Sequence, residues 1–260
     1  MAIIMKTELG KCKLCGSPVR IVRRADGAAD HYEGIDPEDC PPPRISPALD
    51  DFLCASRKGK RTVAIVGAAW SSRAWAPYQD ERVEIWTLNE MHGRSGLSRV
   101  SRWFDIHPKN WFMGNNRHGH RDWMEQEHPF PIYTQQVYDN VPNSVPYPLA
   151  EIQAKLLTRT WRNDRQIKKL FSSTVSYMVA LALHEGFERI ELFGIELVMT
   201  DEWAYQREAL AYWLGKADGM GVEVWMPETC ALFQIPLYGY EEVRNATGGS
   251  TPIDFSMEAR

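Results

Sequence analysis

The chain has 260 residues, of which 44% are hydrophobic and 25% are charged, and its formal net charge is −4. This composition is that of an ordinary globular protein, so it excludes collagen, a coiled coil and a wholly disordered chain. The negative charge excludes general electrostatic binding of nucleic acid by the whole chain. No apolar run approaches the roughly 18 residues of a membrane span, and residues 1–10 lack the features of a secretory signal. We therefore expect a cytoplasmic protein.

Cysteine usage sets the first 57 residues apart from the rest. They hold four of the five cysteines, and an odd total in such a chain argues against a disulfide framework. Cys12 and Cys15 form a C-x₂-C-G pair of the kind that zinc ribbons use. A zinc site would take Cys40 and Cys54 as its further ligands, with His31 as a substitute. Such a metal would be structural, and the alternative is a set of ordinary reduced thiols.

Proline and glycine mark the boundaries of the main domain. The stretch 41–47, PPPRISP, predicts an extended linker, because proline fixes φ and disfavours the α conformation before it. We expect a Cys-rich segment at 1–57, a nucleotide-binding domain at 58–244 and a flexible tail at 245–260, where Gly248-Gly249 precedes Pro252.

From residue 62, apolar strands alternate with helical patterns. Strands are expected at 62–67, 83–88, 102–107, 130–134, 189–194 and 222–226. Helices are expected at 109–127, within 147–169 as one or two segments, at 172–184 with Gly186 as a left-handed cap, and at 202–218. Strands separated by helices predict an α/β fold with a Rossmann-like, doubly wound and mostly parallel sheet.

Ligands of such sheets bind beyond the carboxyl ends of the strands, so the residues after each strand are the candidates. Gly67 allows a tight turn after the first strand, and Ser71 or Ser72 can cap a following helix and present amides to an anion. The turn matches neither G-x-G-x-x-G nor the P-loop, which needs a lysine, and a plain capped turn is the alternative. Asn89 follows the second strand and suits a base or ribose edge, or serves simply as a turn residue.

The third strand ends in Asp105 and His107, which strand alternation places on one face. Because imidazole titrates near neutrality, His107 is a candidate general base, and a structural histidine is the alternative. His118 and His120 follow in a predicted loop and are candidates for binding an anionic acceptor.

Hydroxyl groups cluster where the helix at 172–184 begins. Ser172, Ser173 and Thr174, together with the unpaired amides of a helix start, predict a phosphate or carboxylate pocket. An N-cap with additional serines is the alternative.

The last strands contribute further candidates. Gly194 allows close approach of a ligand ring, and Glu196 is a candidate for holding ribose hydroxyls. Tyr205 and Gln206, near the start of the last helix, are expected to face the cleft. The basic residues between Lys155 and Lys169 favour either a phosphate-binding surface or a solvated helix face.

Four of these segments, in this order, carry a resemblance to known proteins: 63–67, 85–89, 172–182 and 190–196. The series resembles the nucleotide-binding fold of bacterial family-42 sialyltransferases. It is also similar to the hydroxymethylpterin pyrophosphokinase-like family (domain of unknown function 115), and proteins of this look occur in phage and prophage gene sets. A phage-encoded chain would act in the host cytoplasm.

The resemblance implies roles for particular positions. It places Gly67 and Ser71 near the phosphates, Asn89 near the nucleotide, Ser172, Ser173 and Thr174 at phosphate or ribose, and Gly194 under the base. The sialyltransferases carry a general-base histidine just before the last helix, where this chain has Ala204, Tyr205 and Gln206. We therefore expect His107 or Glu196 to act as the base.

Three functions remain open at this point. The first is a glycosyltransferase that acts from a sugar nucleotide on a hydroxyl acceptor, either a glycan or modified phage DNA. The second is an ATP-dependent pyrophosphokinase or nucleotidyl transferase, which would need Mg²⁺. The third is a nucleotide-binding protein without turnover. The candidate Mg²⁺ ligands are Asp105, Glu196, Asp201 and Glu202.

Overall fold

The computed structural model describes residues 6–11, 18–23, 29–33, 45–69, 72–94, 96–114, 116–157, 170–197, 201–228 and 230–233. Side chains are described from residue 45 onward, except those of Arg117, residues 201–205 and Ala231. None of the helices in this part of the chain combines the length and the apolar character that a membrane span requires.

A seven-stranded sheet in which every pairing is parallel forms the centre of the main domain. Its strands are β4 (Thr62–Val66), β5 (Val83–Leu88), β6 (Arg102–Phe104), β7 (Ile132–Thr134), β8 (Ser144–Pro146), β9 (Arg189–Phe193) and β10 (Glu223–Trp225). The predicted Rossmann-like α/β sheet is thereby confirmed. The sequence missed β8, which has only three residues, one of them proline.

The strand order, β10-β9-β4-β5-β6-β7-β8, locates the point where the sheet reverses direction. From β4 the chain adds strands on one side as far as β8. It then returns to place β9 on the other side of β4, followed by β10. The carboxyl ends of β4 and β9 therefore flank the topological switch point, which is where doubly wound sheets hold their ligands.

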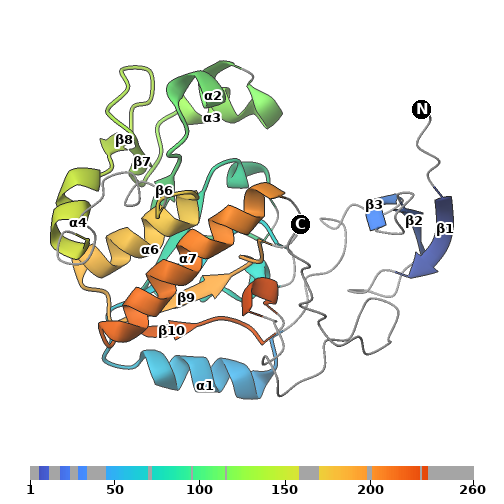
Figure 1. Ribbon diagram of the computed structural model, residues 1–260, viewed down its shortest axis with the longest axis horizontal. Coiled ribbons are helices and arrows are strands. Elements are labelled where there is room, and N and C mark those ends of the chain that lie inside the picture. The colour runs from blue at the N-terminus through green and yellow to red at the C-terminus, as the bar shows by residue number, and fades with distance from the viewer. Residues whose placement is uncertain are drawn as a thin grey trace, which may run out of the picture.

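One face of the sheet is covered by α6 (Thr174–Glu185) and α7 (Asp201–Gly219), which lie side by side, and α4 (Leu149–Leu156) packs on α6 (Figure 1). Alternate strand residues such as Val63 and Ile65 join the helices in the largest apolar core. Residues 175–176 and 178–183 of α6 are all buried. This helix lies within the core, and Gly186 ends it in the predicted left-handed conformation, with φ of 77°.

The opposite face is covered by α1 (Pro47–Arg57) and by the segment after β4. The side chain of Ser46 caps α1, Pro47 starts it, and Leu53 is fully buried. Residues 41–47 were predicted to be a linker, so α1 was missed, although a serine cap before proline is a typical helix start. Residues 41–44 lie outside the described part of the chain.

A buried ion group fixes α1 to the sheet. The Arg57 guanidinium makes two hydrogen bonds of 2.7 and 3.0 Å to the Glu191 carboxylate, and Arg189 Nε donates to the same carboxylate at 2.7 Å. All three side chains are at most 5% exposed. The helix therefore packs with the sheet, although residues up to 57 had been assigned to the N-terminal segment.

The prediction of one continuous helix at 109–127 is wrong. The chain forms α2 (Lys109–Gly114), the 3₁₀ turn η4 (Arg117–Gly119) and α3 (His120–Met124). Asn116, His118 and Gly119 have positive φ values, which end one helix and redirect the chain before the next. The two short helices pack over a separate apolar core beside β6 and β7 that includes Trp103.

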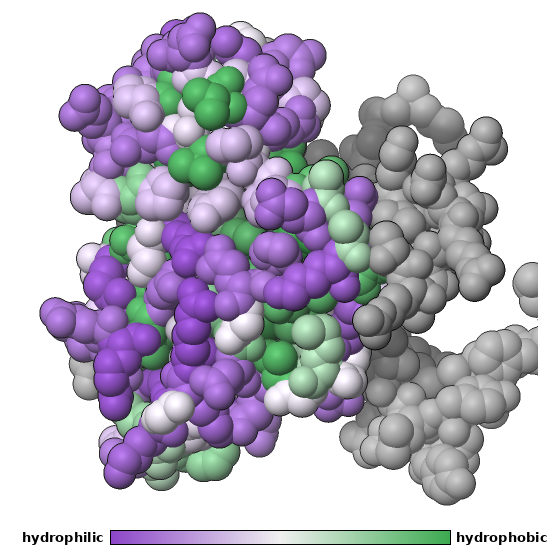
Figure 2. Space-filling view, turned by 90° about the vertical axis from the view of Figure 1, so that its left-hand side faces the viewer, coloured by the Kyte–Doolittle hydropathy of each residue, from purple (hydrophilic) through white to green (hydrophobic). Residues whose placement is uncertain are grey.

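Other turns are built from 3₁₀ helices. They are η2 (Arg73–Trp75), η3 (Met91–Gly93) and η5 (Ala231–Phe233). The expected helix after β4 is therefore only one 3₁₀ turn. On the side of α4 and β8, the molecular surface is largely hydrophilic, with small separate apolar patches (Figure 2).

The N-terminal part contains an antiparallel sheet that the sequence did not predict. Strands β1 (Lys6–Lys11), β2 (Pro18–Arg23) and β3 (Ala29–Glu33) pair in the order β1-β2-β3. Cys12, Cys15 and Cys40 lie outside the described residues, as do residues 158–169 and the tail at 245–260. Cys54 is an exposed thiol on α1, so the zinc ligand set stays a prediction.

Candidate functional site

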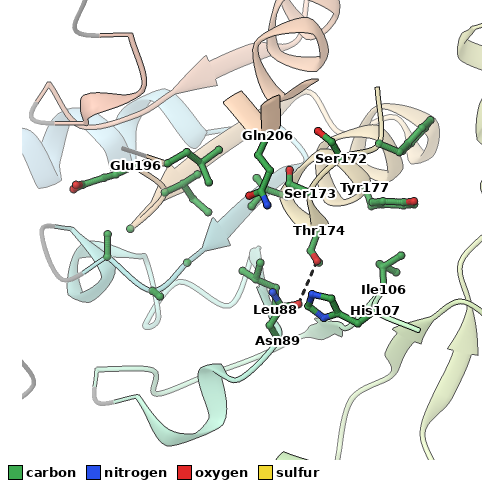
Figure 3. Close-up of a pocket in the computed structure, with 18 of the residues that line it drawn as sticks. Leu88, Asn89, Ile106, His107, Ser172, Ser173, Thr174, Tyr177, Glu196 and Gln206 are labelled. Atoms are coloured by element: carbon green, nitrogen blue, oxygen red, sulfur yellow. Dashed lines mark hydrogen bonds between the residues drawn. The ribbon is translucent and has the colours of Figure 1, made fainter. Parts of the chain in front are cut away.

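A cavity of about 660 Å³ lies at the switch point of the sheet. Its walls come from the segments that follow β4, β5, β6 and β9, from the start of α6, and from Gln206 of α7 (Figure 3). The predicted candidates Gly67, Asn89, His107, Gly194 and Glu196 all line it. Ser172, Ser173 and Thr174 line it as well.

The floor of the cavity is formed by two glycines that touch each other. A Cβ on Gly67 would lie 2.6 Å from the Gly194 oxygen, and a Cβ on Gly194 would lie 2.7 Å from the oxygens of Gly67 and Ala69. Gly194 has φ of +64°. The Ala69 amide donates to the Gly194 oxygen at 2.9 Å, and the Gly194 amide donates to Ser72 Oγ at 2.9 Å. The two glycines therefore allow the β4 and β9 segments to meet.

Ser72 has a different role from the one expected. Its side chain is buried, it makes no side-chain cap for η2, and its hydroxyl accepts the Gly194 amide. Ser71 lies outside the described residues. Among the described residues, no α-helix begins between β4 and β5, and the α-helix whose start borders this cavity is α6.

The start of α6 is built by its three hydroxyl residues. Ser173 is the N-cap, and its Oγ accepts from the Ser176 amide at 3.2 Å. The first amides of a helix have no intrahelical partner and carry the positive end of the helix dipole. Ser172, Ser173 and Thr174 all line the cavity, so the start of α6 borders it. The arrangement suits an anion such as a phosphate.

Asn89 is held from three directions. Its φ is 49°, its amide donates to the Phe104 oxygen, and its oxygen accepts from Trp103 Nε1 at 3.0 Å. Its side-chain oxygen accepts the Thr174 hydroxyl at 3.2 Å (Figure 3). The NH₂ donors are then the groups of this side chain that suit a ligand.

Asp105 links two histidines through its two carboxylate oxygens. His107 Nδ1 lies 2.8 Å from Oδ1, and His120 Nε2 lies 2.7 Å from Oδ2. The His107 amide also donates to Oδ1, at 3.1 Å. Although burial alone would raise the pKa of Asp105, the hydrogen bonds from His107 and His120 lower it below its ordinary value. The carboxylate is therefore a buried anion.

This contact fixes the tautomer of His107. A carboxylate only accepts, so the ring proton of neutral His107 lies on Nδ1 and the basic lone pair on Nε2. The side chain is 35% exposed, and its ring lies 5.6 Å from that of Trp111, which is itself exposed. His107 thus has the partner and the accessibility that a general base needs.

A second cavity, of about 330 Å³, adjoins the first. Ala68, Leu88, Asn89 and His107 line both cavities. The second is otherwise formed by Glu90, Met91, Arg94, Asp105, Trp111 and His120. His107 and Asn89 therefore stand between two ligand-sized spaces.

The remaining candidates are placed less centrally. Glu196 lines the first cavity, but its carboxylate is directed away from His107, whereas the Gln206 side chain points into the space (Figure 3). The side chain of Tyr205 lies outside the described ones. His118 is exposed, with its Nε2 3.9 Å from Glu90 Oε2. His120 is buried against Asp105 and is not the surface ligand that the loop pattern suggested.

The sequence missed Trp111 and Leu197, both of which line these cavities. Leu197 has φ of 50° just after β9, and no residue-type signal predicts that conformation for leucine. Among the described residues, no group of three or more His, Cys, Asp or Glu side chains is arranged to hold a metal ion.

No family model matches the chain, and no curated protein matches it. The chain is similar to solved structures of two sialyltransferases from Campylobacter jejuni. CstII in complex with the substrate analogue CMP-3FNeuAc is 13% identical, covers 64% of this chain and 80% of its own, and has a TM-score of 0.40. The monofunctional α-2,3-sialyltransferase Cst-I is 15% identical, covers 67% and 78%, and has a TM-score of 0.42.

These neighbours are sialyltransferases, the class that the sequence resemblance names. Kinship with the pyrophosphokinase-like family and a phage origin stay predictions.

Proposed function

We propose that the chain is a glycosyltransferase that moves a sugar from a nucleotide-activated donor to a hydroxyl acceptor. The observation that supports this most directly is the position of His107, oriented by Asp105, between two adjoining cavities. One cavity has a helix start suited to phosphate, and the other has an exposed tryptophan at its rim. A base between an anion pocket and an acceptor space is what a direct transfer needs.

The donor would occupy the larger cavity. Its phosphate would lie at the start of α6, where amides and the Ser173 hydroxyl offer hydrogen bonds, and the NH₂ group of Asn89 would reach the nucleotide or sugar. The acceptor would enter from the second cavity, across Trp111. An aromatic face of this kind can pack against a sugar ring or a nucleobase, so a glycan and a DNA acceptor both fit.

Transfer would proceed by displacement at the anomeric carbon. His107 Nε2 takes the proton of the acceptor hydroxyl as its oxygen attacks, the bond from carbon to the phosphate oxygen breaks, and the nucleotide leaves with the electron pair. The imidazolium that forms is stabilised by the Asp105 carboxylate. The amides of α6 stabilise the charge that develops on the leaving phosphate.

The test begins with donor binding. A thermal-shift panel would compare CMP-, UDP-, GDP- and dTDP-sugars with ATP, each with and without Mg²⁺. A ligand at a hundredfold its Kd adds about 2.7 kcal/mol of stability. A shift with one sugar nucleotide in the absence of metal supports the proposal and names the donor. A shift only with ATP and Mg²⁺ overturns it in favour of pyrophosphoryl transfer.

Turnover is then measured with the selected donor against glycan and single-stranded DNA acceptors. His107→Ala should abolish acceptor-dependent nucleotide release and leave donor affinity nearly unchanged, because the ring serves the proton transfer. Full activity of this variant would remove His107 as the base.

Ser173→Ala tests the phosphate pocket. It should weaken donor binding, since it removes a hydroxyl and a cap from the helix start that faces the cavity. Ser46→Ala is the matched control, because it removes the same kind of cap from α1 on the other face of the sheet. Both variants should lose about 1 kcal/mol of stability. Equal donor affinity in the two variants would exclude a phosphate at α6.

A further inference from the structure

The environment of His120 sets it apart from an ordinary core histidine. Its side chain is 3% exposed, and its Nε2 lies 2.7 Å from Asp105 Oδ2. Its Nδ1 is buried and has no hydrogen-bond partner among the described residues. Its ring stacks on the ring of His92, with 5.1 Å between the two ring centroids and 3° between the two ring planes. Within the described part of the chain, its side chain thus makes its hydrogen bond with the carboxylate that orients His107.

The unpartnered Nδ1 defines which nitrogen carries the ring proton. Asp105 can only accept, so Nε2 must donate to it. A second proton on Nδ1 would put an N–H donor in a buried place without an acceptor, at a high cost in free energy. His120 is therefore arranged as a fixed Nε2–H donor to Asp105.

The donor has a specific consequence for Asp105. The carboxylate is 1% exposed, and burial by itself favours the protonated acid. The bonds from His107 and His120 oppose that tendency and keep the pKa of Asp105 below its ordinary value. Without His120, Oδ2 would lose its donor, and the effect of burial on the pKa of Asp105 would be opposed by His107 alone.

We propose that His120 is a positioning residue for the base: it holds Asp105 ionised and in the orientation that fixes His107 as its Nδ1–H tautomer. The inference rests on the proposed function for its effect on catalysis, but its effect on the tautomer can be measured without any substrate. His120 acts through Asp105 in this scheme and does not contact the reacting atoms.

Other titratable groups surround the pair and have to be distinguished from it. His92 lies in η3, Glu90 directly precedes this turn, and Arg94 directly follows it. The charge of Asp105 also reaches Tyr138. The titratable and charged groups that face this region are Glu90, His92, Arg94, His107, His118, His128 and Tyr138. Burial, as the largest cause, lowers the pKa of His92.

Two substitutions separate the hydrogen bond from the ring. His120→Phe keeps a flat ring against His92 and removes the donor to Asp105. His120→Gln removes the ring and keeps an N–H donor at a similar reach. His128→Phe is the control for histidine loss in the same aromatic group, because His128 stacks near Trp123 and bonds to the Trp123 oxygen, and has no bond to Asp105.

The first measurement is the tautomer of His107, by ¹⁵N NMR of the imidazole nitrogens in the folded, ligand-free protein. We expect an Nδ1–H tautomer in the wild type, in His128→Phe and in His120→Gln, and a mixture of tautomers in His120→Phe. An unchanged His107 signal in folded His120→Phe overturns the inference, whatever the protein catalyses.

The second measurement is the pH profile of turnover. In His120→Phe, kcat should fall on the order of ten- to hundredfold, the range for a lost hydrogen bond to a charged group, with the donor KM unchanged. The acid limb should move to higher pH, because Asp105 protonates more readily. His120→Gln should recover most of the rate. A wild-type rate and profile in His120→Phe overturn the inference.

The outcomes also separate this inference from the proposed function. If no donor is turned over but the tautomer changes in His120→Phe, the positioning role stands and the reaction class is wrong. Should His120→Phe fail to fold, His120→Leu provides the second variant, because it also removes the N–H donor to Asp105. An unchanged Nδ1–H tautomer of His107 in that variant overturns the inference.

Discussion

The contact between Gly67 and Gly194 makes a prediction whose size follows from the geometry. Gly194→Ala places a Cβ at φ of +64° and 2.7 Å from two backbone oxygens. The left-handed conformation costs about 1–2 kcal/mol for a residue with a Cβ. The clash also pushes the β4 and β9 segments apart, which weakens the hydrogen bond between Ala69 and Gly194, worth about 1 kcal/mol. Together with overpacking of about 1–3 kcal/mol, the expected loss is about 3–6 kcal/mol.

Two other glycines separate these contributions. Gly186→Ala has a similar φ of +77° but nothing within 4 Å of its Cβ, so it should lose only the conformational part, about 1–2 kcal/mol. Gly67→Ala introduces the close contact at a residue without a positive φ. Its unfolding free energy should therefore fall only by the contribution of overpacking, about 1–3 kcal/mol. Stability is measured by urea unfolding followed by tryptophan fluorescence, since Trp86, Trp103 and Trp213 are fully buried. If Gly194→Ala is no less stable than Gly186→Ala, the close contact of the two segments is refuted.

Three further predictions concern buried charge and the cavity rim. Glu191→Gln should lose about 3–5 kcal/mol in urea unfolding, because it leaves the buried guanidinium of Arg57 without its carboxylate; a loss below 1 kcal/mol would contradict a structural role. Asp105 has a lowered pKa in the folded state, so its stabilisation is present above the unfolded value of about 3.9 and disappears as pH falls through the folded one. The wild type should therefore lose more unfolding free energy than Asp105→Asn between pH 5 and 3. Parallel curves of unfolding free energy against pH for the two proteins would contradict this prediction. Trp111→Ala should raise the acceptor KM with little change in donor affinity, and an unchanged acceptor KM would remove Trp111 from the site.

The sheet was predictable because its strands have a pattern that local sequence carries. Residues 62–66 and 189–193 are short, largely apolar runs between turn signals, and both are buried strands as expected. The end of α6 was equally local, because a left-handed glycine cap stands at Gly186. The start of α1 has its signals too, in Ser46 and Pro47, but the prolines before them favoured a linker.

The arrangement of the site depends on contacts that local sequence does not encode. The sequence predicted Asp105 and His107 on one face of a strand at 102–107, but β6 ends at Phe104, and the two residues meet in the segment after it through the hydrogen bonds of His107 to the Asp105 carboxylate. His120 reaches the same carboxylate because the chain reverses at Asn116 and His118, which both have positive φ values. No strong residue preference predicts these values from the sequence. The pairing of Gly67 with Gly194 likewise follows from strand order, which brings β4 beside β9 although more than a hundred residues separate them.

Two buried carboxylates in this protein show why only one of them suits catalysis. Glu191 is paired with Arg57 and Arg189, whose guanidiniums stay charged at any working pH. That group holds α1 on the sheet. Asp105 is paired with two imidazoles, and the neutral ring of His107 has a basic nitrogen, Nε2, that can take up a proton. His107 reaches both cavities, so the charge on Asp105 can stabilise a proton that arrives from a ligand.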